Sequence, residues 1–401
     1  MRRYMLLLTT SLMLFTNAGC PTADPDDPGN VGGQDTPGPA GPQGPQGPTG
    51  PQGPPGAPAP IPPAKPSPVG VWRVDSGELF RDFVYSDLKV IEFRADGTAT
   101  IHAQDPVSLG LQCVPTIYFT YDKLLALDTY DEDGEIALFD LVDQDHLKLT
   151  GVATSLQLTR IAEVPAELRC GTLTPVRSIA LQRGVEPYGG LAYQGSPPGL
   201  NHGLLWFTDY SYDTRAINVE TGAEIPSLKL KVKSPGNFVQ AMQGDTFWGI
   251  CNCGDDDPTQ VNRATNLVLD EVKVNQLGAG DVDALAYDEA GAVLWAATYD
   301  RTTRTDQIVR INAGAEPDLL IDKRPFGGVQ AISFAAGRLW VLSWDGSVLE
   351  IDPATAKAVK TYANPDRKFY WKGIAVVGDR IFLSGDSDFD EVSEIVEFRL
   401  P

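Results

Sequence analysis

The chain has 401 residues, of which 40 are glycine and 32 proline, so it is long enough for two or three domains and contains a segment rich in these two residues. With 53 acidic against 32 basic residues, its net charge of −21 repels phosphate backbones and anionic headgroups. No nucleic-acid partner is expected.

The N-terminus has the pattern of a bacterial export signal. Arg2 and Arg3 precede an apolar run over residues 5–15, which is too short to span a bilayer. No later segment has 18 consecutive apolar residues that could serve as a membrane anchor. We therefore expect residues 1–19 to be a signal peptide and the mature protein to be exported.

The cleavage region predicts a lipid anchor. Asn17-Ala18-Gly19-Cys20 resembles a bacterial lipobox, whose cysteine is acylated, although Asn17 departs from the usual aliphatic residue. Acyl chains on Cys20 would hold the protein at a membrane, with the outer membrane, the periplasm and the cell surface all open as locations in the cell envelope. An ordinary signal peptide is the alternative.

Residues 20–69 form a tether that is rich in proline and glycine. Almost no large apolar side chain is available to offset the chain entropy of folding. Glycine recurs at every third position from Gly38 to Gly56, and residues 38–58 resemble bacterial collagen-like repeats. The stalk is either a monomeric spacer or the core of a homotrimer.

A small β-barrel is predicted over residues 70–165. Short alternating runs separated by turn signals indicate about eight strands, the first of which begins at Gly70-Val71-Trp72. The opening Gly-x-Trp and the closing Arg160 resemble the signature of lipocalin-like barrels, in which the arginine packs over the tryptophan. The resemblance implies a closed barrel, either filled by side chains or hollow.

Four cysteines follow Cys20, an even number that suits disulfides in an exported protein. We expect Cys113 to pair with Cys170, while the pairings with Cys251 and Cys253 stay open, because four cysteines allow three arrangements.

Residues 175–401 contain a five-fold repeat. The alanines Ala192, Ala241, Ala284, Ala331 and Ala375 are 43 to 49 residues apart, a spacing that fits one four-stranded propeller blade each. An aromatic residue in each following strand is expected in the core, since a wedge-shaped blade needs a large ring: these are Trp206, Trp248, Trp295, Trp340 and Phe382.

The repeat predicts a five-bladed β-propeller, closed by the chain's own earlier strand. The last repeat ends after three strands, and residues 176–182 are expected to supply its fourth. The repeat over residues 337–362, with Ile351-Asp352-Pro353, resembles propellers of the NHL and quinoprotein-like type. The predicted fold class is therefore all-β, a lipocalin-like barrel followed by a propeller, and a fold of this kind hosts both enzymes and binders.

No catalytic residue is assigned from the sequence. His102, His146 and His202 are widely separated, and no nucleophile elbow, P-loop or zinc motif occurs. No cofactor is expected, although Asp386, Asp388 and Asp390 have the spacing of calcium ligands. A solvated acidic turn is preferred there.

A ligand is expected where the inner strands of the propeller begin. The residues leading into these strands combine aromatic faces with a few polar groups, as is typical of sugar or peptide binding: Tyr188, Asn237, Asp281, Phe326, Tyr370 and Trp371.

Three functions follow from this pattern. The first is a binding or scaffold module of the cell envelope that recognises an extracellular glycan, peptide or protein. The second is an extracellular propeller enzyme, either a lyase, a lactonase or a glycan-active hydrolase. The third is a collagen-like trimeric adhesin.

Overall fold

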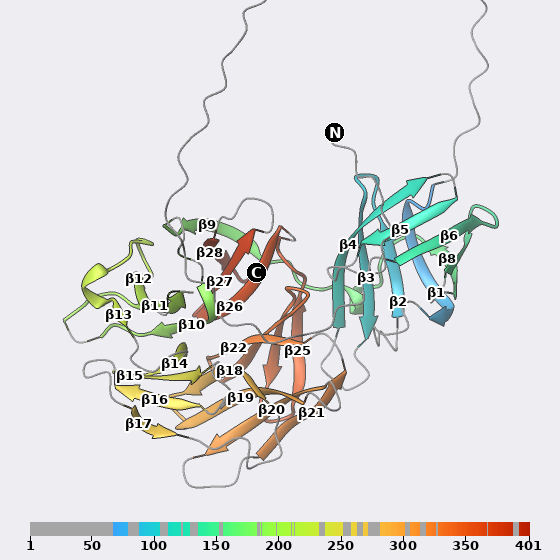
Figure 1. Ribbon diagram of the computed structural model, residues 1–401. Helices are drawn as coiled ribbons and strands as arrows, with labels where there is room; N and C mark the ends of the chain where they lie inside the picture. Colours follow the sequence, from blue (N-terminus) through green and yellow to red (C-terminus); the bar gives the residue numbers. More distant parts are fainter. Residues whose placement is uncertain are drawn as a thin grey trace, which may run out of the picture. The chain divides into compact units, whose positions relative to one another are not determined.

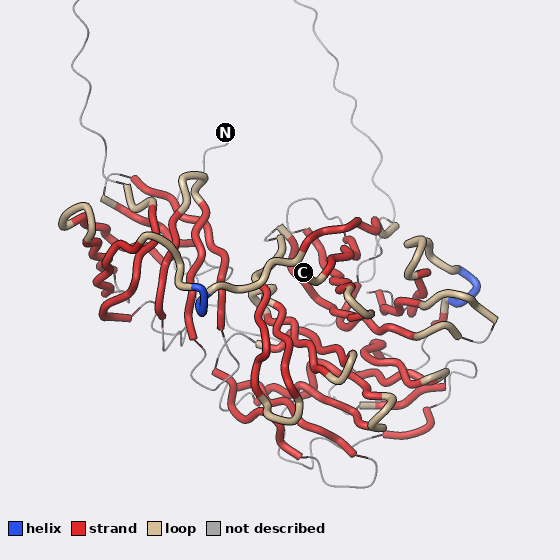
Figure 2. The backbone as a smooth tube through the Cα atoms, turned by 180° about the vertical axis from the view of Figure 1, so that it is seen from behind, coloured by secondary structure: helices blue, strands red, loops and turns tan. Residues whose placement is uncertain are grey.

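The computed structural model describes residues 67–401 with gaps. The signal region, Cys20 and the collagen-like repeat therefore lie outside the described residues. The gaps are 79–87, 105–110, 122, 129–134, 152–154, 183–184, 186, 198, 210, 212, 232–236, 252–257, 263–267, 272–280, 301–304, 313–317, 326–327, 367 and 388–392. The described part is almost entirely strand, with two short 3-10 turns, η1 (Ala166–Leu168) and η2 (Pro226–Leu228) (Figure 2). No helix in it is long and apolar enough to cross a membrane.

The first eight strands form a closed antiparallel barrel in chain order, β1 pairing with both β2 and β8 (Figure 1). The strands are β1 (Gly70–Glu78), β2 (Leu88–Phe93), β3 (Thr98–Gln104), β4 (Leu111–Tyr121), β5 (Leu124–Asp128), β6 (Glu135–Leu141), β7 (His146–Gly151) and β8 (Ser155–Ile161). The prediction of a closed barrel is confirmed.

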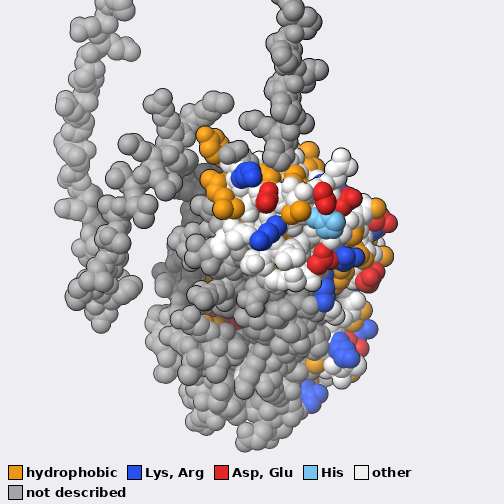
Figure 3. All heavy atoms as spheres, turned by 90° about the vertical axis from the view of Figure 1, so that its right-hand side faces the viewer, with side chains coloured by type: hydrophobic (Ala, Val, Ile, Leu, Met, Phe, Trp, Pro, Cys, Tyr) orange, Lys and Arg blue, Asp and Glu red, His pale blue; other side chains and the backbone are white. Residues whose placement is uncertain are grey.

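Large apolar side chains fill the barrel interior. Trp72, Ile91, Phe93, Phe139 and other members of the same cluster are at most a few per cent exposed. On the outside, several apolar side chains of β4 to β6 are exposed, and Figure 3 shows apolar side chains beside charged ones on one face. The barrel has the core of a packed domain.

Trp72 and Arg160 make the contact that the sequence predicts. The Arg160 guanidinium lies 4.1 Å from the centre of the Trp72 ring, and the Trp72 indole donates to the Pro68 carbonyl oxygen at 2.6 Å. Gly70 has a φ of +143°, and a side chain there would collide with Arg160. The positive φ therefore favours glycine at this position, and the arginine packs closely over it.

The second half of the chain contains, within the described residues, five four-stranded antiparallel sheets. Four of them run in chain order: β10 (Pro187–Gln194), β11 (Leu204–Asp209), β12 (Asp213–Asn218) and β13 (Leu230–Lys231); β14 (Asn237–Gln243), β15 (Thr246–Cys251), β16 (Thr259–Asn262) and β17 (Val268–Glu271); β18 (Asp281–Asp288), β19 (Val293–Asp300), β20 (Thr305–Asn312) and β21 (Asp318–Pro325); β22 (Val329–Ala335), β23 (Arg338–Ser343), β24 (Val348–Asp352) and β25 (Lys357–Tyr362).

The fifth sheet joins the end of the chain to an earlier strand. Its order is β26 (Phe369–Val377), β27 (Arg380–Ser387), β28 (Ser393–Arg399) and β9 (Thr174–Ala180). β28 pairs with β9 in antiparallel register, Ile395 opposite Ile179. The predicted closure is confirmed, and so is the core position of the repeated aromatic residues, since Trp206, Trp248, Trp295, Trp340 and Phe382 are all buried.

The segment between barrel and sheets is fastened on both sides. Cys170 forms a disulfide with Cys113 of β4, as predicted. The next residue, Gly171, donates to the Thr361 carbonyl oxygen at 2.7 Å, and its own carbonyl accepts from the Ala363 amide at 3.1 Å. The disulfide therefore ties the barrel to a segment that is itself bonded to β25.

Removing this disulfide should destabilise the protein. We expect the double substitution Cys113→Ser and Cys170→Ser to lower the free energy of unfolding by about 2–4 kcal/mol, because the unfolded chain regains the freedom of the closed loop. Thermal unfolding followed by circular dichroism measures the change. A reductant should lower the Tm of the wild type in the same way; a Tm that neither treatment changes would contradict the prediction.

His102 should make stability depend on pH. Burial lowers its pKa below the ordinary value of 6.5, and the hydrogen bond to the Leu168 carbonyl oxygen offsets only part of this. The folded state thus binds this proton less readily than the unfolded state, and stability falls as pH drops below 6.5. We expect His102→Gln to remove this part of the slope of Tm between about pH 7 and pH 5. Equal slopes in the two proteins would show that His102 is not responsible.

Candidate functional site

The first strand of each four-stranded sheet contributes to a ring. β10, β14, β18, β22 and β26 contact one another in this order, and β26 contacts β10. They surround a cavity of about 50 Å³ that is lined at equivalent positions by Tyr193, Met242, Tyr287, Phe334 and Val376. Small-molecule sites usually measure about 300–1,000 Å³, so a substrate of ordinary size has to bind at a mouth of this channel.

At one mouth, Tyr370 and Asp386 lie directly opposite each other. Tyr370 is the second residue of β26, and Asp386 comes near the end of β27, where the two strands pair in antiparallel register. Directly opposed residues place their side chains on the same face of a sheet, with Cβ atoms about 4.5–5.5 Å apart. A phenol and a carboxylate therefore share one face of this mouth.

Lys372 joins the pair through a shift in strand register. Trp371 pairs with Gly385, but Gly373 pairs with Ser384, so that Lys372 is an extra residue in β26. Such an insertion re-aims a side chain. The Lys372 Nζ lies 2.7 Å from Asp386 Oδ1 and 5.8 Å from the centre of the Tyr370 ring, and Lys372 is only 8% exposed.

The same shift recurs in two neighbouring first strands. In β18 it falls at Asp283, and in β22 it falls at Gln330. Gln330 reaches the next sheet, where its Oε1 accepts a hydrogen bond from the Tyr370 hydroxyl at 3.1 Å. Polar residues thus occupy corresponding positions in three consecutive sheets, and two of these sheets meet at Tyr370.

Trp344 completes the cluster. It follows β23 directly, is 53% exposed, and its ring approaches that of Tyr370 edge-on at 6.0 Å between centroids. We call Gln330, Trp344, Tyr370, Lys372 and Asp386 the mouth cluster. Within it, an aromatic surface stands beside an amide, an ammonium group, a phenol and a carboxylate.

A second cluster of charged side chains lies at the same ends of the strands, and its members bond to one another and to nearby backbone amides. Asp209, 1% exposed, accepts from the amides of Ser211 and Asp213 and from Arg215 Nε at 2.7 Å, and Arg215 also donates to Glu224. Burial opposes the charge of Arg215, but the hydrogen bonds to both carboxylates outweigh it and raise its pKa. This group fixes a loop.

The structure places the predicted ligand residues unequally. Tyr370 belongs to the mouth cluster. Trp371 is 1% exposed, and its indole donates to Asn364 Oδ1 at 3.0 Å, so it belongs to the core and not to the mouth surface. The starts of β10, β14 and β18 include three further predicted residues, Tyr188, Asn237 and Asp281, whose side chains lie outside the described part of the structure. Phe326 lies outside it entirely.

The predicted calcium loop is described only at its first residue. Asp386 is paired with Lys372, while Asp388 and Asp390 lie outside the described residues. No group of three or more metal-ligating side chains occurs in the described part of the chain. The side chain of Cys251 and the whole of Cys253 are likewise outside it.

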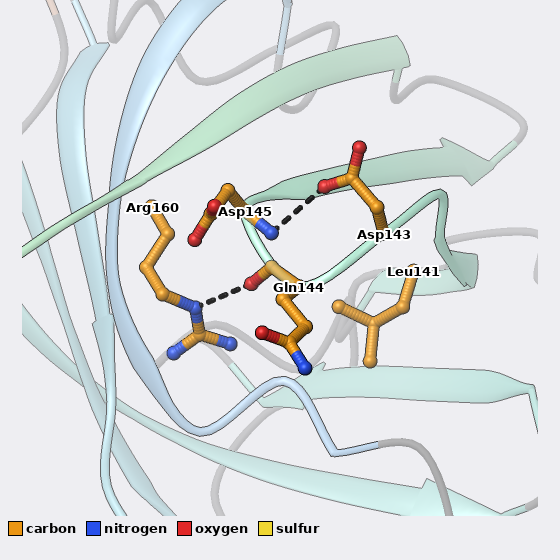
Figure 4. Close-up of a pocket in the computed structure, with 5 residues that line it drawn as sticks. All are labelled: Leu141, Asp143, Gln144, Asp145 and Arg160. Carbon is orange, nitrogen blue, oxygen red and sulfur yellow. Dashed lines mark hydrogen bonds between the residues drawn. The ribbon is translucent and has the colours of Figure 1, made fainter.

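The barrel has a separate pocket of about 580 Å³ beside Arg160 (Figure 4). Leu141, Asp143, Gln144 and Asp145 also line it, and Arg160 Nε donates to the Gln144 carbonyl oxygen at 2.7 Å. A further hydrogen bond to Val69 and the ring of Trp72 occupy the same guanidinium group. Arg160 therefore closes the barrel end by holding two chain segments together.

A closed ring of four-stranded antiparallel sheets around a central channel defines a β-propeller. No protein family model and no curated protein matches the chain. Among solved structures, it is similar to a glutaminyl cyclase from Myxococcus xanthus, with 16% identity over 57% of this chain and 98% of that chain and a TM-score of 0.41. It is also similar to a catalytically inactive virginiamycin B lyase from Staphylococcus aureus with quinupristin, with 15% identity over 78% and 94% and a TM-score of 0.34.

The binding or scaffold module, which the sequence favours, is corrected against these two structures, both of which are enzymes. The propeller enzyme is the hypothesis taken up below as a proposal. At such low identity no substrate and no residue role is transferred, and the chemistry has to be argued from the mouth cluster.

Proposed function

We propose that the chain is a lyase of the five-bladed propeller type, in which the mouth cluster eliminates an oxygen leaving group from a carbon next to an acidic C–H bond. The observation that carries the proposal is the direct pairing of Tyr370 and Asp386, with the ammonium group of Lys372 beside Asp386. We further propose that the barrel is lipocalin-like, which the packing of Arg160 on Trp72 supports.

Elimination requires one base and one acid on the same face of the substrate site. The Asp386 carboxylate is the base that takes the proton from the carbon adjacent to a carbonyl group. The electron pair of that C–H bond forms the new C=C bond, the C–O bond breaks, and the Tyr370 hydroxyl gives its proton to the leaving oxygen. Atoms and charges balance without a further reactant.

Lys372 and Gln330 prepare this pair. The ammonium group of Lys372 keeps a positive charge beside the carboxylate, where it also favours the negative charge that develops on the substrate carbonyl. Gln330 accepts a hydrogen bond from the Tyr370 hydroxyl, which positions the phenol oxygen at the mouth. The O–H bond then turns from Gln330 to the leaving oxygen when the substrate is bound, while the ring stays in place.

Elimination fits the mouth cluster better than glycoside hydrolysis does. Hydrolysis by most glycosidases uses two carboxyl groups that flank the bond to be cleaved. In the described mouth cluster, the two groups opposed across β26 and β27 are one phenol and one carboxylate. This combination supplies a base and an acid of different strength.

The location of the enzyme is proposed from the sequence alone. The lipobox-like residues before Cys20 support an acylated, membrane-anchored protein of the cell envelope, and the collagen-like repeat supports a spacer that holds the enzyme away from the membrane. We propose a monomeric spacer, with a homotrimer through that repeat as the alternative, and no cofactor, since Asp386 is paired with Lys372.

The function can be tested with model substrates of known structure. The mature chain would be incubated with β-alkoxy esters, β-acyloxy esters and polygalacturonate in methyl-esterified and free-acid form. Elimination produces a C=C bond conjugated with the carbonyl group, which is followed by ultraviolet absorbance and confirmed by mass spectrometry. Cleavage that leaves only saturated ends, or no reaction with any of these compounds, would contradict the proposal.

A further inference from the structure

Trp344 is unusual among the aromatic residues of the propeller because it is exposed. Within the described residues after 175, the other exposed large apolar side chains are Val176, Leu269 and Val359, none of them aromatic. An exposed indole ring costs hydrophobic free energy that burial would recover. Its position beside Tyr370 at the channel mouth makes it a candidate contact for a ligand.

The Trp344 ring is held in place by Gly328. A Cβ atom at residue 328 would lie 2.0 Å from Cδ1 and 2.3 Å from Nε1 of the indole, so the ring rests directly on the glycine backbone. The Trp344 amide donates to the Gly328 carbonyl oxygen at 3.0 Å. The residue is thus exposed on one face and supported on the other.

The hairpin that carries Trp344 is equally well fixed. Ser343 donates its amide to the Ser347 carbonyl oxygen at 2.9 Å, and Asp345 Oδ1 accepts from the Ser347 amide at 2.9 Å. From outside the hairpin, Asn364 Nδ2 donates to the Asp345 carbonyl oxygen at 2.8 Å. A ligand therefore meets a preformed surface, which reduces the entropy lost on binding.

We propose that Trp344 is a platform on which a sugar ring of the substrate stacks, and that the substrate is an uncharged glycan containing esterified uronic acid. This inference rests on the proposed function. The apolar C–H face of a pyranose ring fits an indole face, and the amide of Gln330 and the groups of Tyr370 and Asp386 stand beside it to meet hydroxyl groups.

The charge of the protein selects the esterified form. A net charge of −21 repels a free polyuronate, whereas its ester is neutral. An ester also makes the neighbouring C–H bond more acidic than a carboxylate does, as the elimination requires. Esterification of the uronic acid therefore improves both the binding of the substrate and its elimination.

Binding of methyl-esterified oligogalacturonate would be measured by isothermal titration calorimetry on the mature chain carrying Asp386→Asn, so that the proposed elimination does not consume the ligand, and each variant below is made in that background. We expect Trp344→Ala to weaken binding by about tenfold or more, and Trp344→Phe to restore part of it. Gly328→Ala should weaken binding as well, because its methyl group displaces the indole. Gly195→Ala is the matched control, since nothing lies within 4 Å of a Cβ atom there.

The outcomes separate this inference from the proposed function. Binding that depends on Trp344 without formation of a C=C bond by the wild type would support the platform and overturn the lyase. Elimination that the single substitution Trp344→Ala leaves unchanged would support the lyase and overturn the platform. Tighter binding of the free acid than of the ester, or binding of a proline-rich peptide and no glycan, would overturn the inference.

Discussion

Tyr370→Phe is expected to reduce the rate constant of elimination by about 10²- to 10⁴-fold while changing KM little, since the substitution removes the proton donor and keeps the ring. Initial rates of C=C formation over a range of substrate concentrations separate kcat from KM. Asp386→Asn should cause a loss of similar size, because an amide cannot accept the proton from carbon.

The matched control is Tyr121→Phe, which removes a phenol that is 81% exposed on the barrel. Its activity should equal that of the wild type. Unchanged kcat in Tyr370→Phe would show that another group protonates the leaving oxygen, and the mouth cluster would then lose its assigned acid.

A second large effect is expected in the core. Trp206 is 1% exposed, and its indole donates to Gln194 Oε1 at 2.9 Å, while Gln194 Nε2 donates to the Gly244 carbonyl oxygen in the next sheet. We expect Trp206→Ala to lower the free energy of unfolding by about 3–5 kcal/mol, because it opens a cavity and leaves a buried amide oxygen without its donor.

Trp344→Ala is the comparison for this experiment. The same chemical change at a half-exposed site should alter stability by only about 0.5 kcal/mol. Urea unfolding of the two variants and the wild type gives all three values. Similar losses in both variants would mean that Trp344 supports the fold, and its role as a binding platform would lose its main argument.

The architecture follows from the sequence because its signals are local and repeated. The spacing of the alanines, the recurring tryptophans and the unfinished last repeat each depend on short-range periodicity, and the pairing of β9 with β28 follows from counting strands. The Gly70-Val71-Trp72 motif predicts the contact of Trp72 with Arg160 for a similar reason.

The mouth cluster depends on features that a single sequence does not display. The register shift at Lys372 turns its side chain toward Asp386, and neither residue type reveals that shift in advance. Tyr370 and Trp371 look alike in sequence, yet neighbouring residues of a strand point to opposite faces, and only Tyr370 reaches the mouth. Trp344 is assigned neither to the core nor to the mouth from the sequence, and its exposure follows from its place directly after β23.

The joining of β9 to β28 delays completion of the propeller until synthesis has ended. Ser178 and Glu394, which share a hydrogen bond, are 216 residues apart, so β9 leaves the ribosome long before its partner exists. Until then the ring stays open and its sheet edges are exposed, a state in which chaperones bind and proteases cleave. A chain that lost its last few residues would remain in that state permanently, so quality control would remove truncated copies before they could act.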